Sequence, residues 1–352
     1  MSTSPHYSRQ PHNAEKDRLL VKLPSRSALA ATLVVGSLIL TGCSSDDSDS
    51  SNSSSDAGSG AEASEVTIEH VYGEDTYPTN PEKVVAIGTA ADNLLALGIT
   101  PDAIVETPDD ADAEWKNDQL EDVKRIPRPE QSLPLEEIAA EDPDLIVGDL
   151  YRIQEEDYDS LKDVTSVLPG IDQSANWVPQ LEALGQIYGL EDKAQEVIDE
   201  DEQAFADARE EFPGLEGKTA LTVQDREGQF GVIADPDNIA NDFYSRLGMT
   251  VPEAYTDGSV KVESGRAMVS YENVSELAAD FMGIYATEGM DQIRAIPGYS
   301  NLPQVESGAV VEDNKAVMAA LNIPSSLSNA WLLDQVSDQL EIASDNESAD
   351  DE

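Results

Sequence analysis

Short apolar runs alternate with stretches of helical periodicity between residues 66 and 342. Val84–Ile87, Leu145–Val147 and Phe281–Tyr285 are nearly continuous apolar runs, a pattern typical of strands that are buried on both faces. Helical stretches separate these runs, and several of them end at a glycine or shortly before a proline. This alternation predicts βα units around parallel sheet, and therefore an α/β fold.

The same pattern predicts the remaining elements. In the N-terminal half these are a strand over Val66–Val71 and helices over Asp92–Leu97 and Glu136–Ala140. The C-terminal half is predicted to contain three further strands and three helices, namely strands over Ala220–Val223, Phe230–Ile233 and Ala309–Val311, and helices over Asn238–Leu247, Glu272–Ala278 and Ser326–Leu340.

A long helical stretch separates the two halves. The periodicity runs from Val178 to about Phe212, and Gly189 predicts a break within it. Pro213 follows and ends the helix. The part from Glu191 onward would extend over about 33 Å at 1.5 Å per residue. This helix is a candidate for a rigid connection between the two halves.

The two halves also echo one another at a constant offset of 136 residues. Glu136 lies eight residues before Asp144–Ile146, and Glu272 lies eight residues before Asp280–Met282. The same offset places the predicted strand Val84–Ile87 on Ala220–Val223. We therefore predict two similar βα-rich lobes, joined by a single long helix, with a ligand cleft between the lobes.

This repeat also sets the predicted domain organisation. The N-terminal lobe should cover residues 66–190, the interlobe helix 191–213 and the C-terminal lobe 214–343. Residues 344–352 are predicted to form an acidic tail.

The N-terminal segment has the features of a signal peptide. Ala28–Leu40 is an apolar run of 13 residues, which follows five Lys and Arg residues and leads into Leu40-Thr41-Gly42-Cys43. Such a run is too short to span about 30 Å of hydrocarbon. The order resembles the lipobox of bacterial lipoproteins, in which the peptidase cuts before a cysteine that carries a diacylglycerol. We predict a signal peptide over residues 1–42, lipidation of Cys43 and a flexible Ser/Asp-rich tether over 43–65.

The composition is strongly acidic. The whole chain has 21 Lys and Arg against 71 Asp and Glu, and a net charge of −50. Without the five basic and two acidic residues of 1–42, 16 basic and 69 acidic residues remain, a net charge of −53. Nucleic-acid binding is excluded, because phosphate contacts need clustered Lys and Arg. A high-salt habitat, in which charge repulsion is screened, is a hypothesis consistent with this charge. Because Cys43 is the only cysteine, the fold cannot depend on a disulfide.

The order and spacing of these motifs resemble the iron-siderophore substrate-binding proteins of ABC importers. The segments that carry the resemblance are Ile68–Gly73, Pro81–Ala86, Asp92–Gly98, Leu135–Ile138, Pro143–Val147, Leu181–Gly189, Gly308–Val310 and Ser325–Leu333. The resemblance implies two βα lobes bridged by one long helix. It also implies a lipid-anchored, extracytoplasmic protein, expected to be a monomer, that captures a ferric siderophore and delivers it to a permease with its ATPase. Glu136 and Glu272 match the family positions at which one acidic residue per lobe contacts permease arginines.

Candidate ligand residues lie in loops that follow the predicted strands, because ligands of open α/β sheets bind beyond the carboxyl ends of the strands. Arg152 and Arg226 occupy such loops and could hold an anionic chelate through charge-assisted hydrogen bonds. Aromatic side chains could stack on a chelate, and the candidates for this role are Tyr151, Trp115, Trp177 and Tyr299. Weaker candidates are Arg266, Arg294 and Tyr255, together with the backbone N–H groups of Gly88, Thr89 and Ala90.

Several alternatives remain open at this point. Haem or a corrinoid could take the place of the siderophore. A His-rich metal site is excluded after signal cleavage, because only His70 remains. A surface hydrolase is a remote alternative, since no Gly-x-Ser-x-Gly motif is present. We expect neither a catalytic residue nor a bound cofactor. The net charge of −53 favours a neutral or weakly charged ligand, unless the cleft is locally basic.

Overall fold

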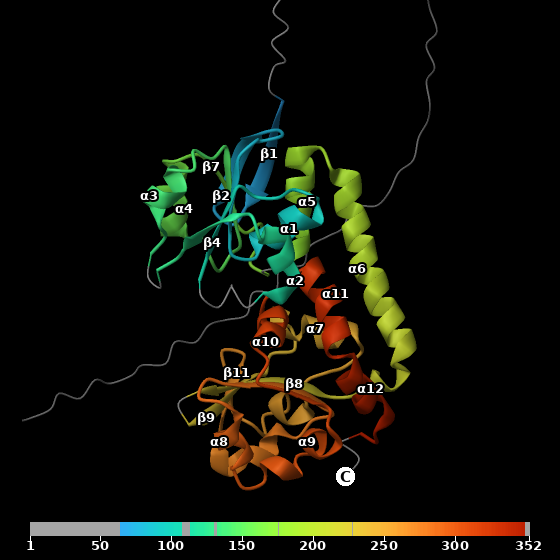
Figure 1. Cartoon of the computed structure of the whole chain (residues 1–352). Helices are drawn as coiled ribbons and strands as arrows, with labels where there is room; N and C mark the ends of the chain where they lie inside the picture. The colour runs from blue at the N-terminus through green and yellow to red at the C-terminus, as the bar shows by residue number, and fades with distance from the viewer. Residues whose placement is uncertain (1–63, 108–112, 130–131, 175, 227, 349–352) are drawn as a thin grey trace, which may run out of the picture. The chain divides into compact units, whose positions relative to one another are not determined.

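The computed structural model describes residues 64–348, except 108–112, 130–131, 175 and 227 (Figure 1). The predicted signal peptide, Cys43 and almost all of the predicted tether lie outside the described residues. Within the described part of the chain, no helix has the length and apolarity needed to cross a membrane.

The first lobe is built on a five-stranded parallel sheet. Across the sheet the strands are β5 (Lys124–Pro127), β4 (Ala103–Glu106), β3 (Val84–Ile87), β6 (Leu145–Gly148) and β7 (Ser166–Leu168). Every residue of β3 and β6 is buried, as their apolar runs predict. Alternate residues serve opposite faces of the sheet: Val84 packs in one core cluster and Val85 in another. Helices cover both faces, and they are α1 (Ala90–Ala96), α2 (Glu114–Asn117), η2 (Asp118–Leu120), α3 (Leu135–Ala139), α4 (Glu155–Lys162) and α5 (Trp177–Tyr188).

A β-hairpin precedes this sheet. The predicted first strand is β1 (Glu65–His70), and it pairs antiparallel with β2 (Gly73–Pro78). The sequence did not predict β2, because its residues are mostly polar and it ends in proline.

A buried polar cluster joins this hairpin to α4. The His70 side chain is fully buried, and its Nδ1 accepts a hydrogen bond from the backbone N–H of Tyr72 at 3.2 Å. The ring proton therefore lies on Nε2, 3.3 Å from an Asp75 carboxylate oxygen. The Tyr158 hydroxyl and the Lys162 ammonium also donate to Asp75. Burial holds the pKa of His70 below its ordinary value, and the hydrogen bond to Asp75 offsets this only in part.

This arrangement predicts a pH-dependent stability. As the pH falls through about 6.5, the unfolded chain binds a proton that buried His70 does not take up, so the free energy of unfolding falls by at most about 1.4 kcal/mol per pH unit. Denaturant unfolding between pH 5 and 8 should show this loss in the natural protein and a smaller one in His70→Gln. Identical pH dependence in the two proteins would contradict the assignment of a neutral, buried His70.

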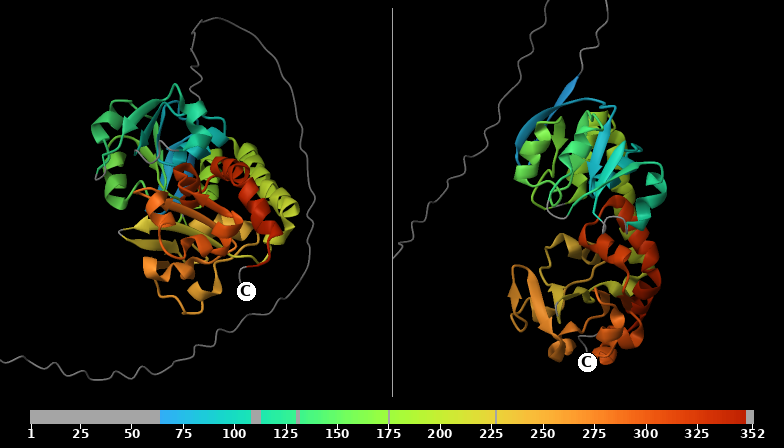
Figure 2. Two further views of the ribbon diagram at one scale, coloured as in Figure 1. Left: turned by 60° about the horizontal axis from the view of Figure 1, so that its bottom comes forward. Right: turned by 60° about the vertical axis from the view of Figure 1, so that its left-hand side comes forward.

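The long stretch that the sequence predicts as helical forms two helices. α5 ends at Gly189, whose φ of 64° is in the left-handed region, and α6 (Glu191–Glu211) follows with 21 residues. η3 (Pro213–Leu215) leads from α6 into the second lobe. α6 contacts the late helix α11 (Ser326–Gln335), and the left-hand view of Figure 2 shows the two side by side.

The second lobe is built on a mixed six-stranded sheet. Across the sheet the strands are β10 (Val262–Glu263), β11 (Arg266–Ser270), β9 (Gln229–Ile233), β8 (Ala220–Arg226), β12 (Phe281–Ala286) and β13 (Val310–Glu312). β8, β12 and β13 are parallel, whereas β8, β9, β11 and β10 pair in antiparallel order. The other helices of this lobe are η4 (Ile239–Asn241), α7 (Asp242–Arg246), η5 (Glu253–Tyr255), η6 (Tyr271–Leu277), α8 (Met290–Arg294), η7 (Tyr299–Asn301), α9 (Pro303–Ser307), α10 (Lys315–Asn322) and α12 (Ser337–Asp345).

The structure corrects three predicted helices. The predicted helix 238–247 begins with Asn238 as an N-cap and divides into η4 and α7. The predicted helix 272–278 is the 3₁₀ helix η6, with a kink at Asn273. The predicted final helix breaks at Val336 into α11 and α12, and α12 extends to Asp345, two residues into the segment predicted as an acidic tail.

The internal repeat is visible in the strand register. Val84 pairs with Leu145 in the first sheet, and Ala220 pairs with Phe281 in the second. Both partners are shifted by the 136 residues that the sequence pattern predicts. The capping aspartates also correspond, because Asp144 accepts from the backbone N–H of Lys83 at 2.9 Å, and Asp280 from that of Thr219 at 2.7 Å. Together with the two parallel sheet cores, this confirms the predicted α/β fold with two related lobes.

Candidate ligand-binding site

A polar pocket lies on the face of the second sheet that is turned toward the first lobe. It has a volume of about 310 Å³, within the usual range for small-molecule sites. Its floor comes from β8, β9 and β11, one side comes from η4 and the end of α10, and Tyr151 reaches it from the first lobe. The polar side chains that line it are Tyr151, Thr222, Gln224, Arg226, Asn238, Arg266 and Asn322.

Strand alternation places the polar side chains of β8 on one face. Leu221 and Val223 point into the core of the second lobe, so Thr222, Gln224 and Arg226 point the other way, into the pocket. The neighbouring strands continue this face, since Gly231 lies opposite Gln224 on β9, and Arg266 on β11 lies opposite Ile233 of β9.

Within the described part of the chain, Arg226 is oriented by an amide and not by a carboxylate. Its Nε and Nη2 atoms donate to the Gln224 side-chain oxygen at 2.9 and 2.7 Å. Its aliphatic stem lies over Gly231, where the absence of a side chain leaves room. Among the described residues, neither Arg226 nor Arg266 forms an ion pair with an acidic side chain.

The rim of the pocket carries exposed apolar surface. Tyr151 and Met268 are 51% and 52% exposed. Among the described residues, these two are the exposed large hydrophobic residues. Met268 lies next to Gly231, on the same face of the sheet. Exposed apolar groups beside a polar pocket are typical of a ligand-binding surface.

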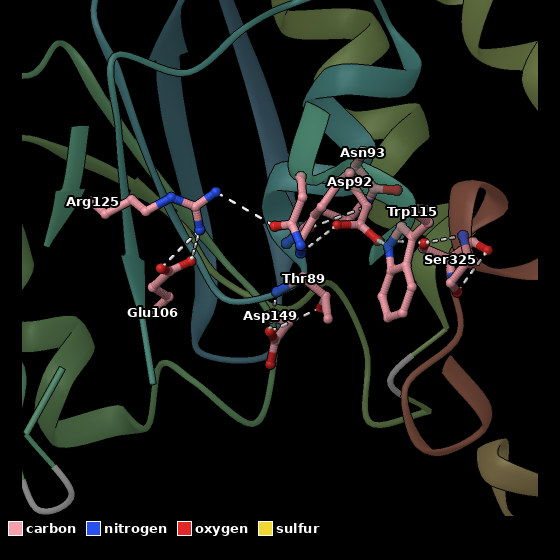
Figure 3. A network of polar contacts seen from close by, with 12 residues as sticks. Thr89, Asp92, Asn93, Glu106, Trp115, Arg125, Asp149 and Ser325 are labelled. Atoms are coloured by element: carbon pink, nitrogen blue, oxygen red, sulfur yellow. Dashed lines mark hydrogen bonds and ion pairs between the residues drawn. The ribbon is translucent and has the colours of Figure 1, made fainter. Parts of the chain in front are cut away.

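Asp149 holds the loop that carries Tyr151. One carboxylate oxygen accepts from the backbone N–H groups of Tyr151 and Arg152, at 2.9 and 3.0 Å. The other accepts from the backbone N–H and the hydroxyl of Thr89, at 3.1 and 3.0 Å (Figure 3). Burial raises the pKa of Asp149, and the charge of Arg152 and the hydrogen bonds from Thr89 oppose this shift. The loop is thereby tied to the turn between β3 and α1.

A smaller cavity adjoins the pocket on the side of the first lobe. It has a volume of about 30 Å³, and its lining includes Asn93, Asp149 and Trp177. Ile323 lines both spaces. Trp177 is therefore a neighbour of the pocket and not one of its walls.

The structure brings some predicted ligand residues together and separates others. Tyr151 and Arg226 line the same pocket, and the weaker candidate Arg266 joins them. Arg152 is folded back over Gly88 beside Asp149 and does not line the pocket.

The remaining aromatic candidates pack against other parts of the protein and do not line the pocket. Tyr299 is 1% exposed in the core of the second lobe, where its hydroxyl donates to Glu312 at 2.7 Å. Burial raises the pKa of Tyr299, and the hydrogen bond to Glu312 adds to this shift. Trp115 packs against Trp331 with ring centroids 5.5 Å apart and does not line the pocket. Of the weaker candidates, Tyr255 is buried and Arg294 pairs with Glu312.

Some lining residues were not singled out from the sequence. Gln224, Asn238 and Asn322 lie in the pocket, but amides are common in surface loops and carry no charge signal. The spacing of Thr222, Gln224 and Arg226 at every second residue was the available sign that one face of β8 is polar.

A buried network connects α1 and α2 of the first lobe to the start of α11 (Figure 3). Asp92 on α1 accepts from Lys116 Nζ at 2.6 Å and from Trp115 Nε1 at 2.7 Å. The Ser325 hydroxyl, 233 residues away in the chain, donates to the same carboxylate at 2.6 Å. Ser325 is the N-cap of α11 and forms a capping box with Ser328. The start of α11 is therefore anchored to the first lobe.

The predicted docking residues are both exposed. Glu136 is the second residue of α3, and Glu272 is the second residue of η6. No ion pair involves either residue within the described part of the chain. Their equivalent positions in the two lobes agree with the internal repeat.

Two lobes of this kind, with a polar pocket on the inner face of one sheet, define a ligand-binding protein. The chain belongs to the family described as periplasmic binding proteins, whose family model matches residues 84–317.

Individual proteins of known structure or function are similar over most of the chain. The iron-uptake system-binding protein of Bacillus subtilis (strain 168) is 21% identical over 309 residues, which is 86% of this chain and 94% of that protein. The crystal structure of Staphylococcus aureus SirA complexed with staphyloferrin B has a TM-score of 0.64 and 20% identity, covering 78% of this chain and 98% of that one. The structure of Streptococcus pneumoniae TIGR4 PiaA in complex with ferrichrome has a TM-score of 0.62 and 21% identity, covering 79% and 98%.

Proposed function

We propose that this protein is the extracytoplasmic substrate-binding component of an ABC importer, and that it captures a ferric siderophore. The observation that carries the proposal is the pocket itself, whose lining includes Arg226, Arg266 and Tyr151 on one face of the second sheet. Charged donors and an aromatic ring are suited to the oxygen-rich ligand shell of a ferric chelate. Family membership supports a transport protein and not an enzyme.

The relatives support the choice of cargo. One is an iron-uptake system-binding protein, and two related structures contain staphyloferrin B and ferrichrome. Each of these alignments covers nearly the full length of the relative, so the similarity extends over both lobes.

The proposal includes the membrane and the permease. Lipidation of Cys43 after removal of residues 1–42 would hold the protein at the membrane by a tether of about 22 residues, with a reach of roughly 25 Å. Glu136 and Glu272 would then contact arginines of the permease, one in each lobe, and the permease and its ATPase would take over the ligand. The short tether would keep receptor and permease at high effective concentration.

A fluorescence titration tests the binding function. Trp177 adjoins the pocket, so a bound chelate should quench its emission. We expect saturable quenching by at least one of three ferric chelates, a hydroxamate, a catecholate or a carboxylate complex. Arg226→Ala should weaken that binding by tenfold or more, since a hydrogen bond to a charged group contributes about 1.5–3 kcal/mol.

Arg294→Ala is the matched control, because Arg294 is paired with Glu312 away from the pocket. It should leave the affinity unchanged. Quenching by haem or cobalamin alone, with no response to any ferric chelate, would contradict the proposed function and favour the haem or corrinoid alternative.

A further inference from the structure

We propose that the pocket selects anionic, carboxylate-bearing ferric chelates, and that Gln224 is the residue that sets this preference. The inference rests on the proposed function and names the class of its ligand. It concerns a residue whose role is to hold Arg226 in place without cancelling its charge.

The pocket differs in charge from the rest of the protein. The chain carries a net charge of −50, yet the pocket lining contains two arginines and no aspartate or glutamate among the described residues. The other lining side chains are neutral. A cleft lined by charge of one sign concentrates the electrostatic field and raises the local concentration of ligands of opposite charge.

Several other arginines of the protein are held by carboxylates. Arg125 contacts Glu106 at 2.9 Å, Arg246 contacts Asp201 at 2.7 Å, and Arg294 pairs with Glu312. In each pair a carboxylate balances the positive charge. Arg226 instead binds the amide oxygen of Gln224 through two N–H groups. The amide oxygen accepts from both N–H groups and so holds the guanidinium in place, but it is neutral and leaves the positive charge for a ligand.

Arg266 provides the second positive charge of the pocket. It lies opposite Ile233 on β9, whereas Arg226 lies opposite Gln229 on the other side of that strand. The two backbone positions are thus four residues apart along β9, or about 13 Å at 3.3 Å per residue. Both side chains line one pocket, so two anionic groups of one chelate can be bound at the same time. Guanidinium groups match the planar geometry of carboxylates, which favours a carboxylate-type chelate.

This inference reverses the expectation from the overall charge, which favoured a neutral ligand. The net charge acts over the whole surface and is screened within about 8–10 Å at physiological salt. The two arginines act at contact distance inside the pocket. The local charge therefore decides which ligand is bound.

Equilibrium titration of the full chain, purified in detergent, with two probes tests the inference. The probes are ferric citrate, which is anionic, and ferric tris(acetohydroxamate), which is neutral. We expect ferric citrate to bind at least tenfold more tightly. In Gln224→Glu the new carboxylate should pair with Arg226 and lower the affinity for ferric citrate by tenfold or more, while the affinity for the neutral probe stays within twofold.

Two further variants separate charge from position. Gln224→Met removes the acceptor but adds no charge, so it should weaken ferric citrate binding less than Gln224→Glu does. Gln186→Glu, at an exposed position on α5, controls for the added negative charge and should have no effect. If Gln224→Glu does not fold, as judged by its thermal unfolding, Arg226→Gln carries the same test of charge preference.

The outcomes distinguish this inference from the proposed function. If neither probe nor any other ferric chelate binds the natural protein, the proposed function fails, and the inference fails with it. If the neutral probe binds as tightly as ferric citrate, the function stands and the charge preference is wrong. If Gln224→Glu binds ferric citrate as tightly as the natural protein while Arg226→Gln does not, the role of Gln224 is wrong.

Discussion

Replacing Asp92 with alanine is expected to lower the free energy of unfolding by about 3–5 kcal/mol. The side chains of Asp92 and Lys116 are 1% and 5% exposed, and they form an ion pair at 2.6 Å. Removing the carboxylate leaves the Lys116 ammonium buried without its counter-charge. It also removes the acceptor of the Trp115 indole and of the Ser325 hydroxyl.

Denaturant unfolding followed by circular dichroism measures this effect. The matched control is the double variant Asp92→Ala with Lys116→Met, which removes both charges and should recover a large part of the lost stability. Equal destabilisation in the single and double variants would show that the loss does not come from an unpaired lysine. A change below 1 kcal/mol in Asp92→Ala would contradict the buried ion pair itself.

The Asp92 network lies close to the pocket, so its loss should also affect ligand binding. Ser325 caps α11, and α11 also contacts α6 through a hydrogen bond from the Asn329 side chain to Asp201 at 3.1 Å. Ile323, two residues before Ser325, lines the pocket. Loss of the Asp92 network should therefore loosen one wall of the pocket and weaken ligand binding, in addition to lowering stability.

The double variant Glu136→Ala with Glu272→Ala is expected to abolish uptake of the ferric siderophore and to leave ligand affinity unchanged. Both glutamates are exposed, one on each lobe, and neither lines the pocket. Their proposed role is to pair with arginines of the permease, so their loss should act on delivery and not on capture. Uptake of ⁵⁵Fe-labelled chelate by cells, together with binding by the purified variant, separates the two steps.

The neighbouring glutamates provide the control for this prediction. Glu137→Ala with Glu276→Ala changes the same two helices, α3 and η6, and removes the same charge. It should leave uptake within twofold of the natural protein. A loss of ligand affinity in the Glu136 and Glu272 variant would assign these residues a structural role. Normal uptake in that variant would exclude them as docking residues.

The sequence predicted the elements whose pattern is strongest. β3 and β6 were predicted because strands buried on both faces form continuous apolar runs. The break between α5 and α6 was predicted because Gly189 suits a left-handed helix end. The repeat at 136 residues predicted two related lobes, and the registers of β3 with β6 and of β8 with β12 show the same offset. These features are local or periodic, so a single sequence contains them.

The sequence was less informative where long-range contacts decide the structure. Tyr299 lies among small and polar residues in the sequence, but its hydroxyl reaches Glu312 within the core. Trp115 is held by Asp92, 23 residues earlier, and by Trp331. Arg266 gains its place in the pocket through the pairing of β11 with β9, which follows from tertiary structure. Arg226 was found because it lies three residues after the predicted strand Ala220–Val223, in what was expected to be a loop; the structure extends β8 to Arg226 itself. The proposed role of its partner Gln224 required the side-chain geometry.

The location of iron in a complex tests the central claim most directly. Crystals of the protein grown with ferric citrate, with diffraction measured at the iron absorption edge, would give an anomalous peak at the metal. The account predicts one peak in the pocket between Tyr151 and the arginine pair Arg226 and Arg266. A peak elsewhere on the protein would contradict the proposed site. A fully formed pocket without iron, in crystals grown at a saturating concentration of ferric citrate, would also contradict it.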